Sequence, residues 1–191
     1  MANIDDFKAN LLGGGARANQ FRVTITPPPF FIGLDIRRTS FLVRGASLPA
    51  MTLGEIAVPF RGRSIYIAGD RSFEETWSTT FLNDTDFMIR NAMERWSNGI
   101  NDLANNTGVT NPADYQVDLT VEQIDRDDTI LKRYIFRSAW PTSISSIDLT
   151  SDATDAIEEF EVTWRYQHFE SSGVTTPVAS QRRGGPAARR S

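Results

Sequence analysis

Few side chains in this 191-residue sequence could support covalent or metal chemistry. There is no cysteine, and the single histidine is His168. The lack of thiols excludes disulfides, thiolate nucleophiles, iron–sulfur clusters and cysteine-type zinc sites. One imidazole excludes a multi-histidine metal site, and a Ser-His-Asp triad would have to use it. His168 follows the last strand pattern and stands beside Phe169 and Glu170, which is more typical of a surface or packing histidine than of a general base.

Acidic pairs are the next candidates for chemistry. Asp127-Asp128 and Glu158-Glu159 could serve as acid and base. Adjacent side chains on a strand point to opposite faces, so neither pair converges on one substrate. The run 125–128 lacks the glycine and distal glutamate of a calcium loop, and Gly13-Gly14-Gly15 lacks the context of a phosphate-binding loop. We therefore predict no catalytic, cofactor-binding or metal-binding residue, and a polar hairpin loop at 125–128.

Charge is distributed unevenly along the chain. The formal net charge is −4, yet residues 171–191 contain four arginines and no acid. Residues 1–170 therefore hold 16 basic groups against 24 acidic ones, a net charge of −8. A body this acidic does not favour stable nucleic-acid binding, which needs clustered lysine and arginine. The sequence has neither a basic, apolar leader nor an apolar run of about 20 residues, so we expect no membrane anchor.

Hydrophobic periodicity indicates a mainly β protein. Apolar and polar residues alternate over Phe21–Ile25, from Ile65, and over Phe73–Phe81, Tyr115–Glu122 and Glu159–Gln167. Five half-buried strands predict an antiparallel β-sandwich or barrel. Pro27-Pro28-Pro29 ends the first strand, because proline cannot donate a ladder hydrogen bond.

One segment has the period of a helix. Its apolar residues recur at spacings of three and four, which predicts one flanking α-helix over about 85–103 that packs on the sheet. Asn83, Asp84 and Thr85 offer an N-cap, and the run 105–108 ends the helix. The apolar stripe consists of Ile89, Ala92, Met93, Trp96, Ile100 and Leu103.

Two further segments bear on assembly. Residues 45–59 form a weakly charged, apolar connection that must be covered, and a neighbouring subunit is one candidate for covering it. Gly69-Asp70 is predicted to be a hairpin turn. We expect a single domain over 1–170, followed by a flexible basic extension over 171–191. That extension is either solvated or docked on an acidic surface of a neighbouring copy or partner.

A series of short motifs runs through residues 3 to 168. They are Leu48-Pro49-Ala50, Pro59–Arg63, Ala68–Arg71 with Phe73 and Trp77, Asn83-Asp84, Trp96, Pro112–Tyr115, Trp140–Thr142 and Phe160–Thr163. In order and spacing they resemble the tail tube protein of contractile-tailed, myovirus-type bacteriophages. The sequence departs from that pattern in an insertion over Pro27–Arg38 and in the basic extension after Phe169.

The resemblance implies a non-enzymatic structural protein of the virion, with a tail-tube-like β-sandwich or barrel and no cofactor. Six copies would close into a ring, and rings would stack into an inner tube that conducts the genome inside a contractile sheath. The implied partners are other copies of this chain, the tail sheath protein, and the baseplate and tail terminator proteins. The tape measure protein and DNA would occupy the lumen transiently, and assembly would take place in the host cytoplasm.

Rings and stacks need heterologous contacts, in which different patches of two copies meet. The resemblance implies that Arg61, Arg63 and Arg71 pair with acids on neighbouring copies. The alternative is that they are solvated strand ends, where an exposed ion pair contributes about 0–1 kcal/mol. Six bodies of −8 would place −48 in each ring, and the part facing the lumen would keep DNA from adhering. The expected interface residues are Leu48, Pro49, Met51, Leu53, Ile56, Val58, Arg61, Arg63 and Arg71.

Two other functions stay open at this point. A type VI secretion ring protein or a baseplate protein that initiates the tube would share the fold. A small hydrolytic enzyme would use His168 and nearby acids.

Overall fold

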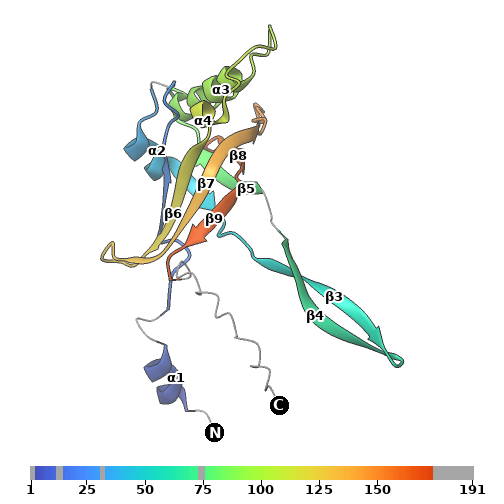
Figure 1. The fold of residues 1–191 in the computed structure, drawn as a ribbon. Coiled ribbons are helices and arrows are strands. Elements are labelled where there is room, and N and C mark those ends of the chain that lie inside the picture. The colour runs from blue at the N-terminus through green and yellow to red at the C-terminus, as the bar shows by residue number, and fades with distance from the viewer. Residues whose placement is uncertain (1–2, 12–14, 31–32, 73–75, 174–191) are drawn as a thin grey trace.

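The computed structural model describes residues 3–11, 15–30, 33–72 and 76–173, and most of them belong to one antiparallel sheet. Seven strands pair in the order β1-β6-β7-β8-β5-β2, with β9 also paired to β7 (Figure 1). This confirms the mainly antiparallel β fold. The strands are β1 (Phe21–Ile25), β2 (Val43–Ala46), β5 (Thr76–Leu82), β6 (Val117–Ile124), β7 (Ile130–Ile144), β8 (Glu159–Arg165) and β9 (His168–Ser171).

Strand β7 joins the two halves of the sheet. Its first part pairs with β6 on one edge and with β9 on the other, and its last residues pair with β8. Between these parts the register with β6 shifts, and Ser138 has a positive φ of 54°. The Asp118 side chain accepts a hydrogen bond from the Ser138 N–H at 3.1 Å, so a side chain satisfies the backbone group at this irregularity.

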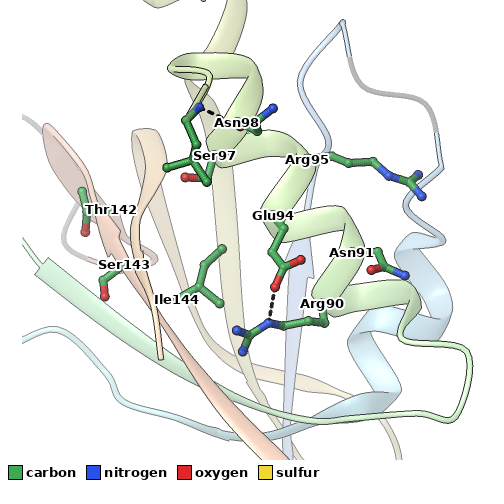
Figure 2. A pocket seen from close by; sticks show the side chains of 10 residues that line it. Arg90, Asn91, Glu94, Arg95, Ser97, Asn98, Thr142, Ser143 and Ile144 are labelled. Carbon is green, nitrogen blue, oxygen red and sulfur yellow. Dashed lines mark hydrogen bonds and ion pairs between the residues drawn. The ribbon is translucent and has the colours of Figure 1, made fainter. Parts of the chain in front are cut away.

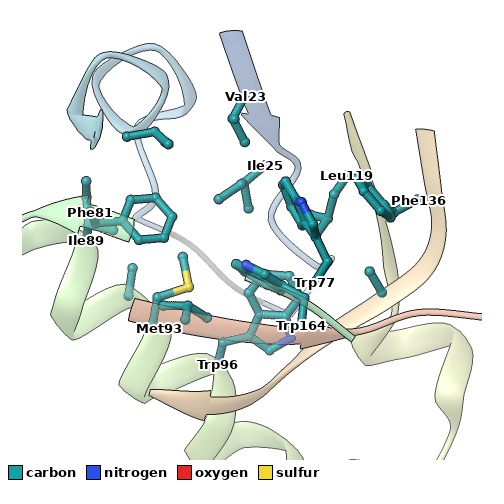
Figure 3. Close-up of a cluster of buried hydrophobic side chains, with 14 of the residues drawn as sticks. Val23, Ile25, Trp77, Phe81, Ile89, Met93, Trp96, Leu119, Phe136 and Trp164 are labelled. Atoms are coloured by element: carbon teal, nitrogen blue, oxygen red, sulfur yellow. The ribbon is translucent and has the colours of Figure 1, made fainter. Parts of the chain in front are cut away.

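The core lies between the two halves of the sheet and helix α3 (Met88–Ile100). Trp77 of β5 stacks on Phe136 of β7 with ring centroids 4.4 Å apart, and the edge of Trp96 in α3 meets Trp164 of β8 at 5.5 Å (Figure 3). The buried Trp164 indole donates to Thr79 Oγ1 at 2.8 Å. The predicted inward faces of β1, β5, β6 and β8 are therefore the faces that pack.

Helix α3 is shorter than the predicted span of 85–103. Asp84 and Phe87 close a tight turn, Phe87 has a φ of 53°, and Asp86 accepts from the Met88 N–H at 3.1 Å, so the first helical residue is Met88. The helix ends at Ile100, and Leu103, placed in the stripe by its spacing, is 96% exposed. The rest of the stripe packs as predicted, with Ile89, Ala92, Met93 and Trp96 buried.

Three short helices were not predicted. They are α1 (Ile4–Asn10), α2 (Ile36–Leu42) and α4 (Pro112–Tyr115). The Asp35 carboxylate caps α2 by accepting from the Arg37 and Arg38 N–H groups. Tyr115 belongs to α4 and not to the following strand, because its carbonyl accepts the Trp96 indole N–H at 3.1 Å before β6 begins at Val117.

Two predictions about residues 45–72 are wrong. The stretch 45–59 is not a loop, because Thr52–Phe60 is strand β3, which pairs with β4 (Arg63–Ser72). Gly69-Asp70 lies inside β4 and is not a turn. The glycine at position 69 instead allows the backbones of β3 and β4 to approach closely, because a Cβ there would lie 3.1 Å from a backbone atom of Gly54 on the facing strand. The loop predicted at 125–128 does connect β6 to β7.

Paired charges tie the peripheral elements to the sheet. Arg137 of β7 donates to both oxygens of Glu170 in β9, at 2.9 and 3.1 Å, and also pairs with Asp118. Arg38 of α2 pairs with Asp84 and with Asp86, the latter at 2.7 Å. The hydrogen bonds from these arginines hold the pKa values of Glu170 and Asp84 below their usual range.

Part of the sequence prediction falls on residues outside the described ranges. These are Gly13 and Gly14, Phe73 at the start of a predicted strand, and the basic extension after Gly173.

The central aromatic stack supports a first prediction. Phe136 is fully buried against Trp77 and Tyr166, so Phe136→Ala should lower the free energy of unfolding by about 3–5 kcal/mol, measured by urea denaturation of unassembled protein. Phe41 is 80% exposed, and Phe41→Ala is the matched control, expected to change stability by less than about 0.5 kcal/mol. Equal effects of the two substitutions would contradict this core assignment.

The lowered carboxylate pKa values predict sensitivity to acid. A carboxylate with a depressed folded-state pKa stabilises the fold above its ordinary pKa, and this contribution is lost as pH falls through the folded value. Wild-type stability should therefore drop below about pH 4. In Arg137→Gln, Glu170 loses the partner that lowers its pKa, so the dependence of the urea midpoint on pH between 5 and 3 should be shallower. An unchanged slope would show that this cluster contributes nothing to acid unfolding.

Candidate assembly interface

The β3–β4 hairpin leaves the body of the molecule as a two-stranded ribbon (Figure 1). Within the part of the chain that the structure describes, these strands pair with each other and with no other strand. Nearly every residue of both strands is exposed to solvent. An isolated two-stranded hairpin is at best marginally stable in water, which makes this ribbon a candidate for contact with another surface.

A two-residue turn sets the register of the ribbon. Phe60 pairs with Arg63, which leaves Arg61 and Gly62 at the tip. Both have positive φ, 45° and 78°, as the type I′ turn demands, and this turn matches the twist of the flanking strands. The short turn therefore fixes which side chains share a face.

One face of the hairpin is apolar. Residues opposite each other in an antiparallel pair project to the same side, and the register pairs Val58 with Ile65 and Ile56 with Ile67. Phe60 continues this face to the tip. The five side chains are 40–55% exposed, so the apolar face meets water along its length. We call Ile56, Val58, Phe60, Ile65 and Ile67 the apolar face.

The other face is smaller and more polar. It pairs Ala57 with Tyr66, Pro59 with Ser64 and Glu55 with Ala68. The contrast between the two faces is that of a ribbon with one side buried against a partner, which is how an antiparallel strand pair is usually stabilised. A contiguous exposed apolar patch of this kind marks an interaction surface.

The hairpin arginines differ from those of the body. Among the described residues, Arg61, Arg63 and Arg71 form no ion pair, and Arg61 lies over the Phe60 ring with its guanidinium carbon 5.3 Å from the centroid. Arg38 and Arg137, by contrast, are each held by two carboxylates. The hairpin thus presents cations beside its apolar face.

The structure divides the nine predicted interface residues into two groups. Leu48, Pro49 and Met51 lie in the connection from β2 to β3, which is anchored to the core because the Trp77 indole donates to the Ser47 carbonyl at 2.7 Å. Leu48 lines a small hollow of about 170 Å³ beside β6. The other six lie on the hairpin or at its tip: Leu53, Ile56, Val58, Arg61, Arg63 and Arg71.

Three members of the apolar face were missing from the predicted set. The alternation of Ile56, Val58 and Phe60 was readable, and the Ile65–Ile67 strand was recognised, but the two were not paired with each other. The signal that joins them is Arg61-Gly62, a turn sequence between two alternating runs.

Another hollow, of about 580 Å³, lies between α3 and β7 (Figure 2). Its lining is mostly polar. The carboxylate among the described lining residues, Glu94, accepts from Arg90 Nε at 2.6 Å, and Arg90 also donates to the Ser145 carbonyl at 2.7 Å. These groups hold one another, so the hollow offers no unengaged base to the hydroxyls of Ser97 and Ser143.

Other chemistry-bearing groups are similarly engaged. His168 Nε2 lies 3.9 Å from Glu170, a carboxylate already bound by Arg137. Within the described ranges, no group of three or more histidine, cysteine, aspartate or glutamate side chains could hold a metal ion. In the same ranges, none of the helices is both long and apolar enough to cross a membrane.

Comparison with known proteins gives a consistent set of matches. A family profile described as "Phage tail tube protein" matches residues 16–172. The tail tube protein of Serratia phage KSP90 is 33% identical over 169 residues, which cover 87% of this chain and 95% of the relative. Tail tube protein gp19 of Enterobacteria phage T4 is 31% identical over 169 residues, which cover 87% and 99% of the two chains.

Solved structures share the fold at much lower identity. A chain from the sheath-tube complex of an extracellular contractile injection system, PVC, in its extended state superposes with a TM-score of 0.59 at 14% identity. The superposition covers 86% of this chain and 95% of that one. A chain from the sheath/tube terminator of the same system gives a TM-score of 0.57 at 13% identity, covering 82% and 96%.

Proposed function

The chain belongs to the phage tail tube protein family, and from that premise we propose that copies of it assemble through the β3–β4 hairpin into stacked hexameric rings. It is a structural protein of the virion, a component of the tail tube of a contractile phage. The observation that carries the ring proposal is the exposed apolar face, which the chain by itself leaves in water.

The geometry of the hairpin suits repeated assembly. A closed ring and an open stack both need heterologous contacts, in which the projecting element of one copy meets a different surface on the next. The hairpin projects beyond the body (Figure 1), so it can reach such a surface without any change in the core. The nine predicted residues, joined by Phe60, Ile65 and Ile67, form the proposed contact set.

Charge supports the role of a conduit. The −8 carried by residues 1–170 would repeat six times in a ring, and acidic groups on the inner wall would repel DNA during its passage. The ring would therefore guide the genome without binding it stably. This role needs no reactive side chain, so we further propose that the protein is not an enzyme.

The remaining partners follow from the position of a tube within a contractile tail. We propose the sheath protein on the outside, baseplate and terminator proteins at the two ends, and the tape measure protein and DNA transiently in the lumen. Residues 1–170 would act as one domain, because the body has one continuous core, and 171–191 as a basic extension.

Assembly of variants tests the hairpin as the contact. Ile65→Asp places a charge on the apolar face and should raise the protein concentration at which tubes form by at least about tenfold, because one buried isoleucine is worth about 1.5–3 kcal/mol. Negative-stain microscopy and sedimentation provide the measurement. Thermal unfolding of the body should stay unchanged, since Ile65 is 52% exposed.

The matched control is Tyr66→Asp, the same substitution one residue away on the other face of the same strand. It should assemble close to the wild-type concentration. Tubes formed by Ile65→Asp at wild-type concentration, or equal loss in both variants, would contradict assembly through the apolar face. A wild-type protein that forms neither rings nor tubes at any salt concentration would contradict the ring proposal as a whole.

A further inference from the structure

Helix α1 carries an apolar stripe that no other described element buries. The stripe consists of Ile4 and Phe7 in the helix and Leu11, the C-cap residue, whose N–H donates to the Phe7 carbonyl at 3.0 Å. Their spacing of three and four residues places them on one side, and they are 70%, 67% and 43% exposed. No residue of α1 is buried among the residues that the structure describes. A seven-residue helix is too short to be stable alone in water, so the stripe needs a surface to pack on.

The hairpin of the same copy is not that surface. In Figure 1, α1 and the β3–β4 ribbon leave the body as separate projections. Each therefore displays an apolar side that the described residues of its own chain leave exposed. Within an assembly every copy supplies one α1 helix and one hairpin, so the helix of one copy can cover the apolar face of the next copy's hairpin, and this contact can repeat through the assembly.

Charge complementarity supports this pairing. The first turn of α1 carries Asp5 and Asp6, for which no ion pair with the described residues is present. The tip of the hairpin carries Arg61 and Arg63, equally unpaired, beside Phe60. If the two apolar sides pack together, the acids of α1 can meet the arginines at one end only. This fixes the orientation of α1 on the hairpin, with the first turn of α1 toward the hairpin tip.

We propose that α1 of one copy packs its Ile4, Phe7 and Leu11 stripe on the apolar face of the β3–β4 hairpin of another copy. The inference rests on the proposed assembly only in requiring that copies meet. It adds which segment occupies the apolar face. It also assigns a role to α1, a helix that the sequence pattern did not predict.

Cysteine cross-linking tests the contact directly, because the natural chain has no cysteine to compete. Phe7→Cys and Ile65→Cys are purified separately, mixed in equal amounts, assembled and oxidised. We expect a cross-linked dimer on non-reducing gels, and a ladder of multimers when both cysteines are in one chain. The control mixture is Phe7→Cys with Tyr66→Cys on the opposite face, which should give at least about tenfold less product.

The outcomes of the cross-linking experiment separate this contact from the ring proposal. Tubes without the Phe7–Ile65 cross-link would overturn this inference and leave the ring proposal intact, with another protein or another segment as the occupant. A link found only within single chains would assign α1 to its own hairpin and also overturn it. If no tube forms, the ring proposal fails, and the cross-link in whatever oligomer is present still decides the contact.

Charge reversal provides a second test that needs no cysteine. Asp5→Lys with Asp6→Lys should raise the protein concentration needed for assembly roughly three- to tenfold, because two exposed ion pairs become like-charge contacts. Adding Arg61→Glu and Arg63→Glu to the same chain should bring this concentration most of the way back to the wild-type value, and added salt should reduce the gap between the Asp5/Asp6 variant and wild type. Failure of the second pair to restore assembly would exclude contact between α1 and the hairpin tip.

Discussion

The constraint on which this structure depends is that a two-stranded ribbon cannot bury its own apolar face. The register fixed by Arg61-Gly62 puts Ile56, Val58, Phe60, Ile65 and Ile67 on one side, and no third strand or helix of the described chain covers them. Contact with a further surface would remove these side chains from water, which is favourable. The same pairing that forms the hairpin thus creates the surface through which we propose that copies assemble.

The body supplies a rigid base for this projecting element. The aromatic core locks β5 to β7 through Trp77 and Phe136, and the Trp77 indole also holds the Ser47 carbonyl at the entry to the hairpin. One tryptophan therefore connects the packing of the core to the position of the ribbon. Because the side chains of the apolar face are 40–55% exposed in the single chain, we expect substitutions there to act on assembly and to leave the fold intact.

The sequence predicted the parts whose pattern is local and repeated. The strands with strict alternation were found, Phe21–Ile25 at its observed bounds, and so was the apolar stripe of α3. The pairing of β3 with β4 was missed although a two-residue turn joins them, because Gly54, Pro59 and Gly69 interrupt the alternation of apolar and polar residues. The reason for a glycine at position 69, close approach of the Gly54 backbone, becomes visible only in three dimensions. Short helices such as α2 depend on a single cap at Asp35, a signal too common in loops to be specific.

The charge pattern bears on how copies would meet in the proposed assembly. Each chain carries a net charge of −4, with −8 on residues 1–170, and this like charge opposes random association of copies through exposed apolar side chains. The hairpin tip departs from this pattern, since Arg61 and Arg63 are unpaired cations beside the apolar face. In the proposed contact, approach is favourable where an acidic, apolar segment meets the tip. Like-charge repulsion elsewhere would then favour this geometry, and burial of the apolar face would stabilise it once it forms.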